Sequence, residues 1–330
     1  MKKIINCFPR VSLEPLNEIA RGYEISQLLF LSLDYDIFRL LRKPRTAKYV
    51  SKKIQSDSYL TEAFLNTLVA LNLLSKVDNK YLNTTLSNTF LVKGKQFYQG
   101  NLIKLKRKSF DFLLKLKHGL KSKEIQEGYT EEINRQFILG NAEGAISGDI
   151  QRALKKISSL SLFKKAKKLL DLGGGHGLYS IALAQMKKDL EIIVFDLPHV
   201  IKITKEFVKK YNMQRRIKLV SGDFTKDDFG KNYDIIFASD VAISNIIRKI
   251  YQSLKQNGAL IYRRWVLNDD KTGPLVAALF EFMLSVRGYE HHVYSLKEYI
   301  DELSKAGFRK VRAIDVSTPS DPTNIIIANK

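Results

Sequence analysis

Residues 171 to 177, Asp-Leu-Gly-Gly-Gly-His-Gly, form the segment whose residue types best suit ligand binding. A glycine-rich turn between a strand and a helix brings backbone amides close to an anionic or polar ligand, and the helix N-terminus adds positive potential. The dinucleotide fingerprint G-x-G-x-x-G, counted from Gly173, requires glycine at position 178, where this chain has Leu178. This spacing argues against NAD.

Acidic residues accompany three successive expected strands. Asp171, two residues before the first glycine, can accept hydrogen bonds from an ammonium group or order the loop. Asp196 follows the second strand, where a carboxylate can accept both hydroxyls of a ribose. After the third strand, Asp223 can accept an adenine amino proton and Phe224 offers an aromatic face. Each acid alone could be a helix cap or a surface residue, but together they predict S-adenosylmethionine (SAM) as the cofactor.

The second half of the chain has the pattern that would position these residues. From Lys167 onward, strands and helices alternate, which is typical of a mainly parallel sheet covered on both faces. We predict an α/β, seven-stranded Rossmann-like domain. Its strands are expected at residues 168–172, 191–195, 217–221, 233–239, 259–266, 310–316 and 324–328, with only a turn between the last two.

The first hundred residues have a helical pattern that ends in a small hairpin. Apolar residues recur at mostly helical intervals from Leu16 to Leu41. Thr46 can cap a short helix, and Ser58 or Thr61 can cap a second one. A tight polar turn at residues 77–81 then joins two short extended segments. Helix, turn, helix and hairpin is the outline of a winged helix.

A winged helix suggests DNA binding, but the second of these helices contains no lysine or arginine from Thr61 to Leu74. Without cations, a recognition helix makes poor phosphate contacts. We therefore expect a dimerisation domain at 1–100, a helical bridge lining the substrate side at 101–160, and the SAM-binding domain at 161–330. A winged-helix DNA-binding regulator remains the alternative, supported by the formal net charge of +21.

Composition favours an ordinary globular protein of a reducing compartment. Cys7 is the single cysteine, so the chain can form neither an internal disulfide nor a cysteine-based metal site, and no metal is expected. No apolar run is long enough for a transmembrane helix, and we expect a cytoplasmic protein. Eight basic residues from Lys104 to Lys123 suit a solvated helix face, an anionic substrate channel or a peripheral membrane contact.

Four motifs resemble the small-molecule O-methyltransferase family, which joins a winged-helix dimerisation domain to a Rossmann-like domain. They are Asp171–Gly177, Phe195–Val200, Gly222–Phe224 and Gly273–Leu275. The resemblance implies a SAM-dependent methyltransferase, a small-molecule acceptor, and a homodimer with intertwined N-terminal domains. It implies that the cofactor contacts are Asp171, Gly173, Gly175, Asp196, Leu197, Asp223, Phe224 and Ser239.

The catalytic pattern of that family is not kept. The histidine that serves as general base corresponds to Ile243, a cofactor-contacting lysine corresponds to Ser239, and a glutamate corresponds to Arg263. Because proximity and alignment supply much of the acceleration in methyl transfer, a missing base does not exclude catalysis. A SAM-binding protein with a regulatory role or different chemistry remains a second hypothesis.

Three catalytic candidates remain. Arg263 or Arg264, at the C-terminal edge of the sheet, could hold an anionic acceptor that needs no proton removal. Asp240 is an alternative base next to the expected cofactor site. His292, with its neighbour His291, precedes an expected helix and could reach inward. Each of the three could also be a structural or exposed residue.

Overall fold

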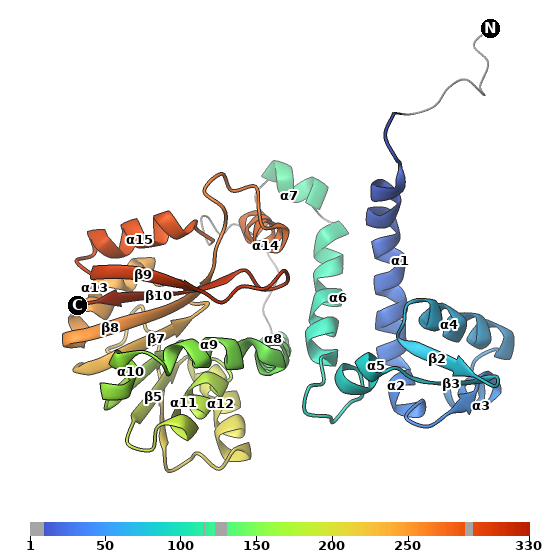
Figure 1. Ribbon diagram of the computed structural model, residues 1–330, viewed down its shortest axis with the longest axis horizontal. Coiled ribbons are helices and arrows are strands. Elements are labelled where there is room, and N and C mark those ends of the chain that lie inside the picture. Colours follow the sequence, from blue (N-terminus) through green and yellow to red (C-terminus); the bar gives the residue numbers. More distant parts are fainter. Residues whose placement is uncertain (1–9, 115, 123–130, 288–292) are drawn as a thin grey trace, which may run out of the picture. The chain divides into compact units, whose positions relative to one another are not determined.

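The computed structural model describes residues 10–114, 116–122, 131–287 and 293–330 (Figure 1). Contacts divide the chain into two compact units, one up to Arg107 and one from Lys108. The candidate histidines His291 and His292 lie outside the described residues. None of the helices in the described ranges combines the length and the hydrophobicity needed to cross a membrane.

The first unit is helical and carries one small sheet (Figure 1). The apolar repeat that predicted one run from Leu16 to Leu41 is split at Asp36, whose left-handed backbone (φ 52°) separates two helices. The elements are α1 (Glu14–Asp34), α2 (Ile37–Leu40), β1 (Arg45–Thr46), α3 (Ala47–Ile54), α4 (Ser58–Ala70), β2 (Leu74–Val77), β3 (Lys80–Asn83) and α5 (Thr85–Phe90). Helix α6 (Gly100–Leu114) runs across the division between the units.

Helix caps define the α3–α4 pair. Thr46 caps α3 as predicted, because its hydroxyl oxygen accepts a backbone N–H three residues further on. The predicted caps of α4, Ser58 and Thr61, are wrong. The cap is Asp57, whose Oδ1 accepts the N–H of Leu60 at 2.8 Å, and both predicted residues already lie inside the helix.

The hairpin of the first unit forms as predicted. Strands β2 and β3 pair antiparallel, and β1 pairs with the other edge of β3. Asp78 and Asn79, between β2 and β3, both have positive φ (46° and 59°), as the favoured two-residue hairpin turn requires. The α3–α4 pair followed by this hairpin is the element order predicted from the sequence.

The second unit contains a seven-stranded sheet, as predicted, with strand order β6-β5-β4-β7-β8-β10-β9. Strands β6, β5, β4, β7 and β8 are parallel, and β10 runs antiparallel to both β8 and β9. The strands are β4 (Lys168–Leu172), β5 (Glu191–Asp196), β6 (Ile217–Ser221), β7 (Tyr233–Ser239), β8 (Leu254–Trp265), β9 (Arg309–Asp315) and β10 (Thr323–Asn329).

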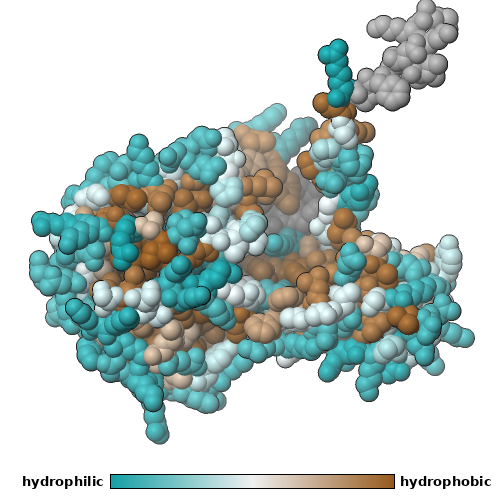
Figure 2. Space-filling model, in the orientation of Figure 1, coloured by the Kyte–Doolittle hydropathy of each residue, from teal (hydrophilic) through white to brown (hydrophobic). Residues whose placement is uncertain are grey.

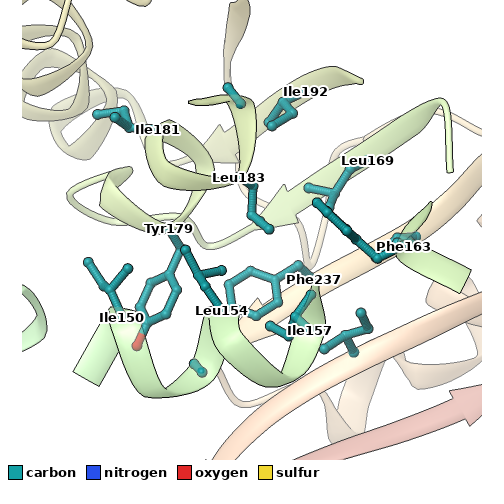
Figure 3. Close-up of a cluster of buried hydrophobic side chains, with 14 of the residues drawn as sticks. Ile150, Leu154, Ile157, Phe163, Leu169, Tyr179, Ile181, Leu183, Ile192 and Phe237 are labelled. Atoms are coloured by element: carbon teal, nitrogen blue, oxygen red, sulfur yellow. The ribbon is translucent and has the colours of Figure 1, made fainter. Parts of the chain in front are cut away.

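Helices cover both faces of this sheet (Figure 1). One core packs against α9 (Ile150–Ile157), α10 (Ser161–Lys165), α11 (Leu178–Met186) and α12 (Pro198–Lys210), and Figure 3 shows part of it. The other core packs against α13 (Ile247–Ser253) and α15 (Leu296–Lys305). The unit also includes α7 (Leu116–Ser122), α8 (Glu131–Gly144) and α14 (Leu275–Val286).

The chain order of the strands reverses between β4 and β7, since β5 and β6 extend the sheet in one direction and β7 and β8 in the other. In open parallel sheets, ligands bind outside the carboxyl ends of the strands at such a switch point. The glycine-rich turn follows β4 directly and therefore lies at this position.

Candidate cofactor and active site

The glycine-rich turn joins β4 to α11 through three glycines with positive φ, Gly173 (68°), Gly175 (54°) and Gly177 (70°). A Cβ atom at Gly173 would lie 2.5 Å from a methyl group of Val241, so glycine is required there for space as well as conformation. A Cβ at Gly175 would meet nothing within 4 Å. The turn is therefore tightly packed at its start and open at Gly175, where a ligand can approach the backbone.

Asp171 packs against the glycine-rich turn and stabilises it. Its side chain is buried, and its Oδ2 accepts a hydrogen bond from the Ser180 hydroxyl at 2.6 Å. Burial raises the pKa of Asp171 to about 7, although the Ser180 hydrogen bond acts in the opposite direction. A Cβ at Gly174 would lie 2.9 Å from the same carboxylate oxygen. Of the two roles suggested by the sequence, these contacts favour ordering the loop.

Asp196 connects the end of β5 to the glycine-rich turn. Its Oδ2 accepts the N–H of Gly175 at 2.8 Å, and its Oδ1 accepts the N–H of Leu197 at 2.7 Å. Burial raises its pKa, although both N–H groups act in the opposite direction. The Thr204 hydroxyl donates to the carbonyl of Gly175 at 2.6 Å. Each carboxylate oxygen of Asp196 keeps acceptor capacity for a ligand hydroxyl.

Asp223 and Phe224 follow β6 in an exposed loop. The Oδ1 of Asp223 accepts both the hydroxyl (2.6 Å) and the N–H (2.9 Å) of Thr225, and these hydrogen bonds lower the pKa of Asp223. The ammonium group of Lys249 donates to the carbonyl of Phe224 at 3.0 Å. The Phe224 ring packs partly buried against the core on the α13 side. The loop is thus held in one conformation beside the end of β6.

Arg263, on β8, lies among three carboxylates and is only 3% exposed. Its Nη2 donates to Asp149 at 2.7 Å and approaches Asp321 at 3.3 Å, and its Nη1 donates to Asp240. A buried guanidinium requires such partners. The sequence suggested that Arg263 holds an anionic acceptor; this expectation needs correction, because the three carboxylates already neutralise its charge.

Arg264, the next residue, lies on the opposite face of the sheet. Its Nε donates to the Tyr299 hydroxyl at 3.0 Å, and its guanidinium carbon lies 5.7 Å and 5.8 Å from the ring centres of Tyr262 and Tyr299. It is 7% exposed. Arg264 is therefore packed into the α15-side core.

Ser239 and Asp240 end β7 beside Arg263. The side chain of Asp240 is 48% exposed, and its backbone is left-handed (φ 56°) with its N–H donating to the carbonyl of Arg263 at 3.0 Å. The Ser239 hydroxyl lies 3.4 Å from Nη1 of Arg263. Ile243, which the sequence resemblance placed at the family's histidine, is buried in the core. Asp240 is thus a carboxylate at this strand end, half exposed to solvent and held by a buried arginine.

Sequence analysis missed Asp149 and Asp321 as partners of Arg263. Asp149 ends a π-helical turn (Ala145–Asp149) between α8 and α9, and Asp321 lies in the turn before β10. The local sequence around each is typical of a purely structural residue. Asp149 follows a glycine before a helix, and Asp321 lies in a Pro-Ser-Asp-Pro turn. No local pattern indicates that their partner is on β8.

The two missed acids differ in their preference for a proton. Burial raises the pKa of Asp149 to about 7, although Arg263 acts in the opposite direction. Burial also acts to raise the pKa of Asp321, but its hydrogen-bonded neighbour Asp149 and the Arg263 guanidinium together lower it. The indole N–H of Trp265 donates to Asp321 at 2.7 Å. Asp149 is therefore the member of this pair that takes up a proton more readily.

His176 orders the middle of the turn. It is buried, and its Nδ1 accepts the N–H of Leu178 at 3.1 Å. Burial, with the nearby charge of Arg263 as a second cause, lowers the pKa of His176 to about 4. The imidazole is therefore neutral at neutral pH and acts as a hydrogen-bond acceptor within the turn.

The chain matches two family models. Residues 115–309 match the O-methyltransferase domain, and residues 17–93 match the O-methyltransferase dimerisation domain. An uncharacterised protein of Methanocaldococcus jannaschii is 30% identical over 94% of this chain and 87% of its own length. The acetylserotonin O-methyltransferase of Bos taurus is 30% identical over 90% of this chain and 92% of its own length.

Solved structures show the same fold. Human N-acetylserotonin methyltransferase, crystallised in complex with SAM, superposes with a TM-score of 0.83 at 23% identity. The superposition covers 98% of this chain and 99% of the human one.

Proposed function

Because the chain belongs to the family of SAM-dependent O-methyltransferases that carry an N-terminal dimerisation domain, we propose that it transfers a methyl group from SAM to a small molecule. One observation carries this proposal. The glycine-rich turn is open at Gly175, and its amide is fixed by Asp196 at the switch point of the sheet.

The residues at the strand ends fit SAM. The turn at Gly173 and Gly175 would take the amino-acid part of the cofactor, with Asp171 and Ser239 beside it. Asp196 would accept the ribose hydroxyls, with Leu197 beside them, and Asp223 and Phe224 would hold the adenine. When bound, SAM supplies an electrophilic methyl group on a sulfonium centre. The protein's part is then to align the acceptor and, where needed, to take up its proton.

We assign the proton uptake to Asp240. Its carboxylate is half exposed, follows Ser239 at the strand end, and is held by the buried Arg263. The anionic acceptor suggested by the sequence loses its support, since Arg263 is already paired. A neutral hydroxyl that must lose its proton suits a site with a half-exposed carboxylate better.

A test of this function uses the purified full chain with methyl-labelled SAM and a small-molecule extract. We expect a labelled product together with S-adenosylhomocysteine (SAH). In Asp240→Asn, kcat should fall about 100-fold, the usual effect of losing a general base, while SAH affinity falls by less than about tenfold, because the contact of Asp240 with Arg263 is weakened as well. Asp301→Asn, an exposed carboxylate on α15, is the control and should keep full activity.

The results separate the alternatives. Binding of SAM without any labelled product would favour the hypothesis of a SAM-binding protein that has lost methyl transfer, which the buried Ile243 at the base position supports. An active Asp240→Asn variant would remove Asp240 from the mechanism but leave the function in place.

We also propose that the chain forms a homodimer through α1. Four apolar side chains at helical intervals are exposed, Leu13 (62%) just before the helix and Leu16 (63%), Ile19 (76%) and Tyr23 (54%) on it. Figure 2 shows brown apolar groups among polar ones along this helix. An apolar stripe of this kind marks a protein contact, and the matching dimerisation domain makes a second copy the expected partner.

A further inference from the structure

Arg263 connects three segments of the second unit that are far apart in the sequence. Through Asp149 it contacts the junction before α9, through Asp240 the end of β7, and through Asp321 the turn before β10. The Thr323 hydroxyl, 3.2 Å from Nη2, adds the first residue of β10. One buried side chain thus fixes the segments around the C-terminal edge of the sheet.

A first chain of contacts leads from Arg263 to the glycine-rich turn through Tyr179. The Tyr179 hydroxyl donates to Oδ2 of Asp149 at 3.3 Å, the same oxygen that accepts from Arg263. Tyr179 is the second residue of α11, directly after the turn, and its ring stacks on His176 with centroids 6.3 Å apart. Tyr179 also belongs to the same buried core cluster as Ile150 of α9, and both are labelled in Figure 3.

A second chain of contacts reaches the same turn through Asp240. The residue after Asp240 is Val241, which packs so closely over Gly173 that a Cβ there would lie at 2.5 Å. The Tyr262 hydroxyl donates to the carbonyl of Val241 at 2.9 Å and holds it in place. Both the start and the end of the glycine-rich turn are therefore linked to Arg263.

The junction before α9 depends on the ion pair between Arg263 and Asp149. Gly148 has φ 125°, and Ser147 and Gly148 both depart from helical geometry, so the segment that ends at Asp149 is a kink between two helices. Without Arg263, Asp149 and Asp321 would be two neighbouring carboxylates with only Arg152 between them, 3.3 Å and 3.0 Å away. Their repulsion would then oppose this geometry.

We propose that Arg263 is a positioning residue for the cofactor: it holds the glycine-rich turn in its binding conformation through Tyr179 and Asp240. The inference rests on the proposed function, because it concerns the site that takes SAM. Arg263 contacts neither the open side of the turn nor solvent, so its effect passes through its neighbours.

The test measures SAH affinity by calorimetry on the intact protein, without reference to turnover. Arg263→Met should weaken SAH binding about tenfold, whereas Arg264→Met should change it less than threefold. Arg264 is a matched control, since it is on the same strand, similarly buried, and faces the opposite core. Arg263→Lys keeps one charge but cannot reach three carboxylates, and it should recover part of the affinity.

A double-mutant cycle keeps the proposal testable if Arg263→Met does not fold. Tyr179→Phe removes only the hydroxyl that contacts Asp149, and it should weaken SAH binding about threefold in the wild-type background. In the Arg263→Lys background the same change should have a clearly smaller effect, because the chain of contacts is already loosened. A residue that merely stabilised the fold would give additive effects.

Two outcomes would overturn the inference while sparing the proposed function. One is a folded Arg263→Met that binds SAH within twofold of the wild type. The other is full additivity of the Tyr179 and Arg263 changes. A wild-type protein that does not bind SAH would instead remove the proposed function, and this inference with it.

Discussion

The acidic residues of the site differ in the partner that stabilises each one. Asp171 accepts from a hydroxyl group, Asp196 from two backbone N–H groups, and Asp240 from a guanidinium. Their positions at the ends of β4, β5 and β7 were visible in the sequence, because acids at strand ends follow the strand pattern. Their partners were not visible, since each depends on how the chain returns to the sheet edge.

His176 gives a prediction about acid stability. Its pKa is near 4 in the folded chain, below the ordinary 6.5, so the unfolded chain binds the proton more tightly. The stability it contributes is therefore fully present above pH 6.5 and is lost as the pH falls toward 4. We expect the free energy of unfolding to drop by about 2 kcal/mol more in the wild type than in His176→Asn between pH 7.5 and pH 4.5.

Denaturant unfolding of both proteins at the two pH values measures this difference. Asparagine keeps an acceptor near the position of Nδ1, so the bond from Leu178 can be retained. Asp171 titrates in the same range with the opposite sign, but it is present in both proteins and cancels in the comparison. Equal pH dependence of the two proteins would contradict the prediction.

At the scale of elements, the central strands of the second unit were predictable because they are buried on both faces. Successive residues alternate between the two cores, as Ile235 and Phe237 face the α9 side while Ile236 and Ala238 face the α13 side. Apolar runs of this kind stand out in a sequence. The turn at Asp36 and the cap at Asp57 were missed, because single residues decide them.

Two glycines of the turn allow a prediction that separates the effect of steric contact on stability from the effect of backbone conformation. Gly173→Ala combines a positive φ with a contact at 2.5 Å, whereas Gly175→Ala has a positive φ in open space. We expect Gly175→Ala to cost roughly 1 kcal/mol of unfolding free energy, the usual cost of a left-handed alanine, and Gly173→Ala to cost clearly more. Denaturant unfolding measures both, and equal costs would show that Val241 moves away freely.

The Arg263 cluster shows where sequence analysis reaches its limit. Asp149, Asp240 and Asp321 lie on different elements, and the fold brings them together only when α9, β7 and β10 are in place. Arginine at this position suggested an anion-binding site, because an isolated guanidinium usually has that role. With its three carboxylate partners, Arg263 instead links three segments of the second unit to one another.

At the scale of the whole molecule, the exposed stripe on α1 predicts the oligomeric state. Ile19→Asp places a charge in the centre of the stripe and should convert a dimer into a monomer, because burying an unpaired carboxylate is costly. Light scattering coupled to size-exclusion chromatography measures the mass. Val77→Asp, on an exposed apolar residue of the hairpin, is the control and should remain dimeric. An Ile19→Asp dimer would exclude α1 as the interface.

The place of β10 has a consequence for synthesis of the protein. It lies between β8 and β9, yet it follows both in the chain. During translation, β8 and β9 therefore emerge before the strand that separates them, and they have to stay apart until it inserts. Asp321 lies two residues before β10, so the last carboxylate around Arg263 is synthesised together with the strand that completes the sheet.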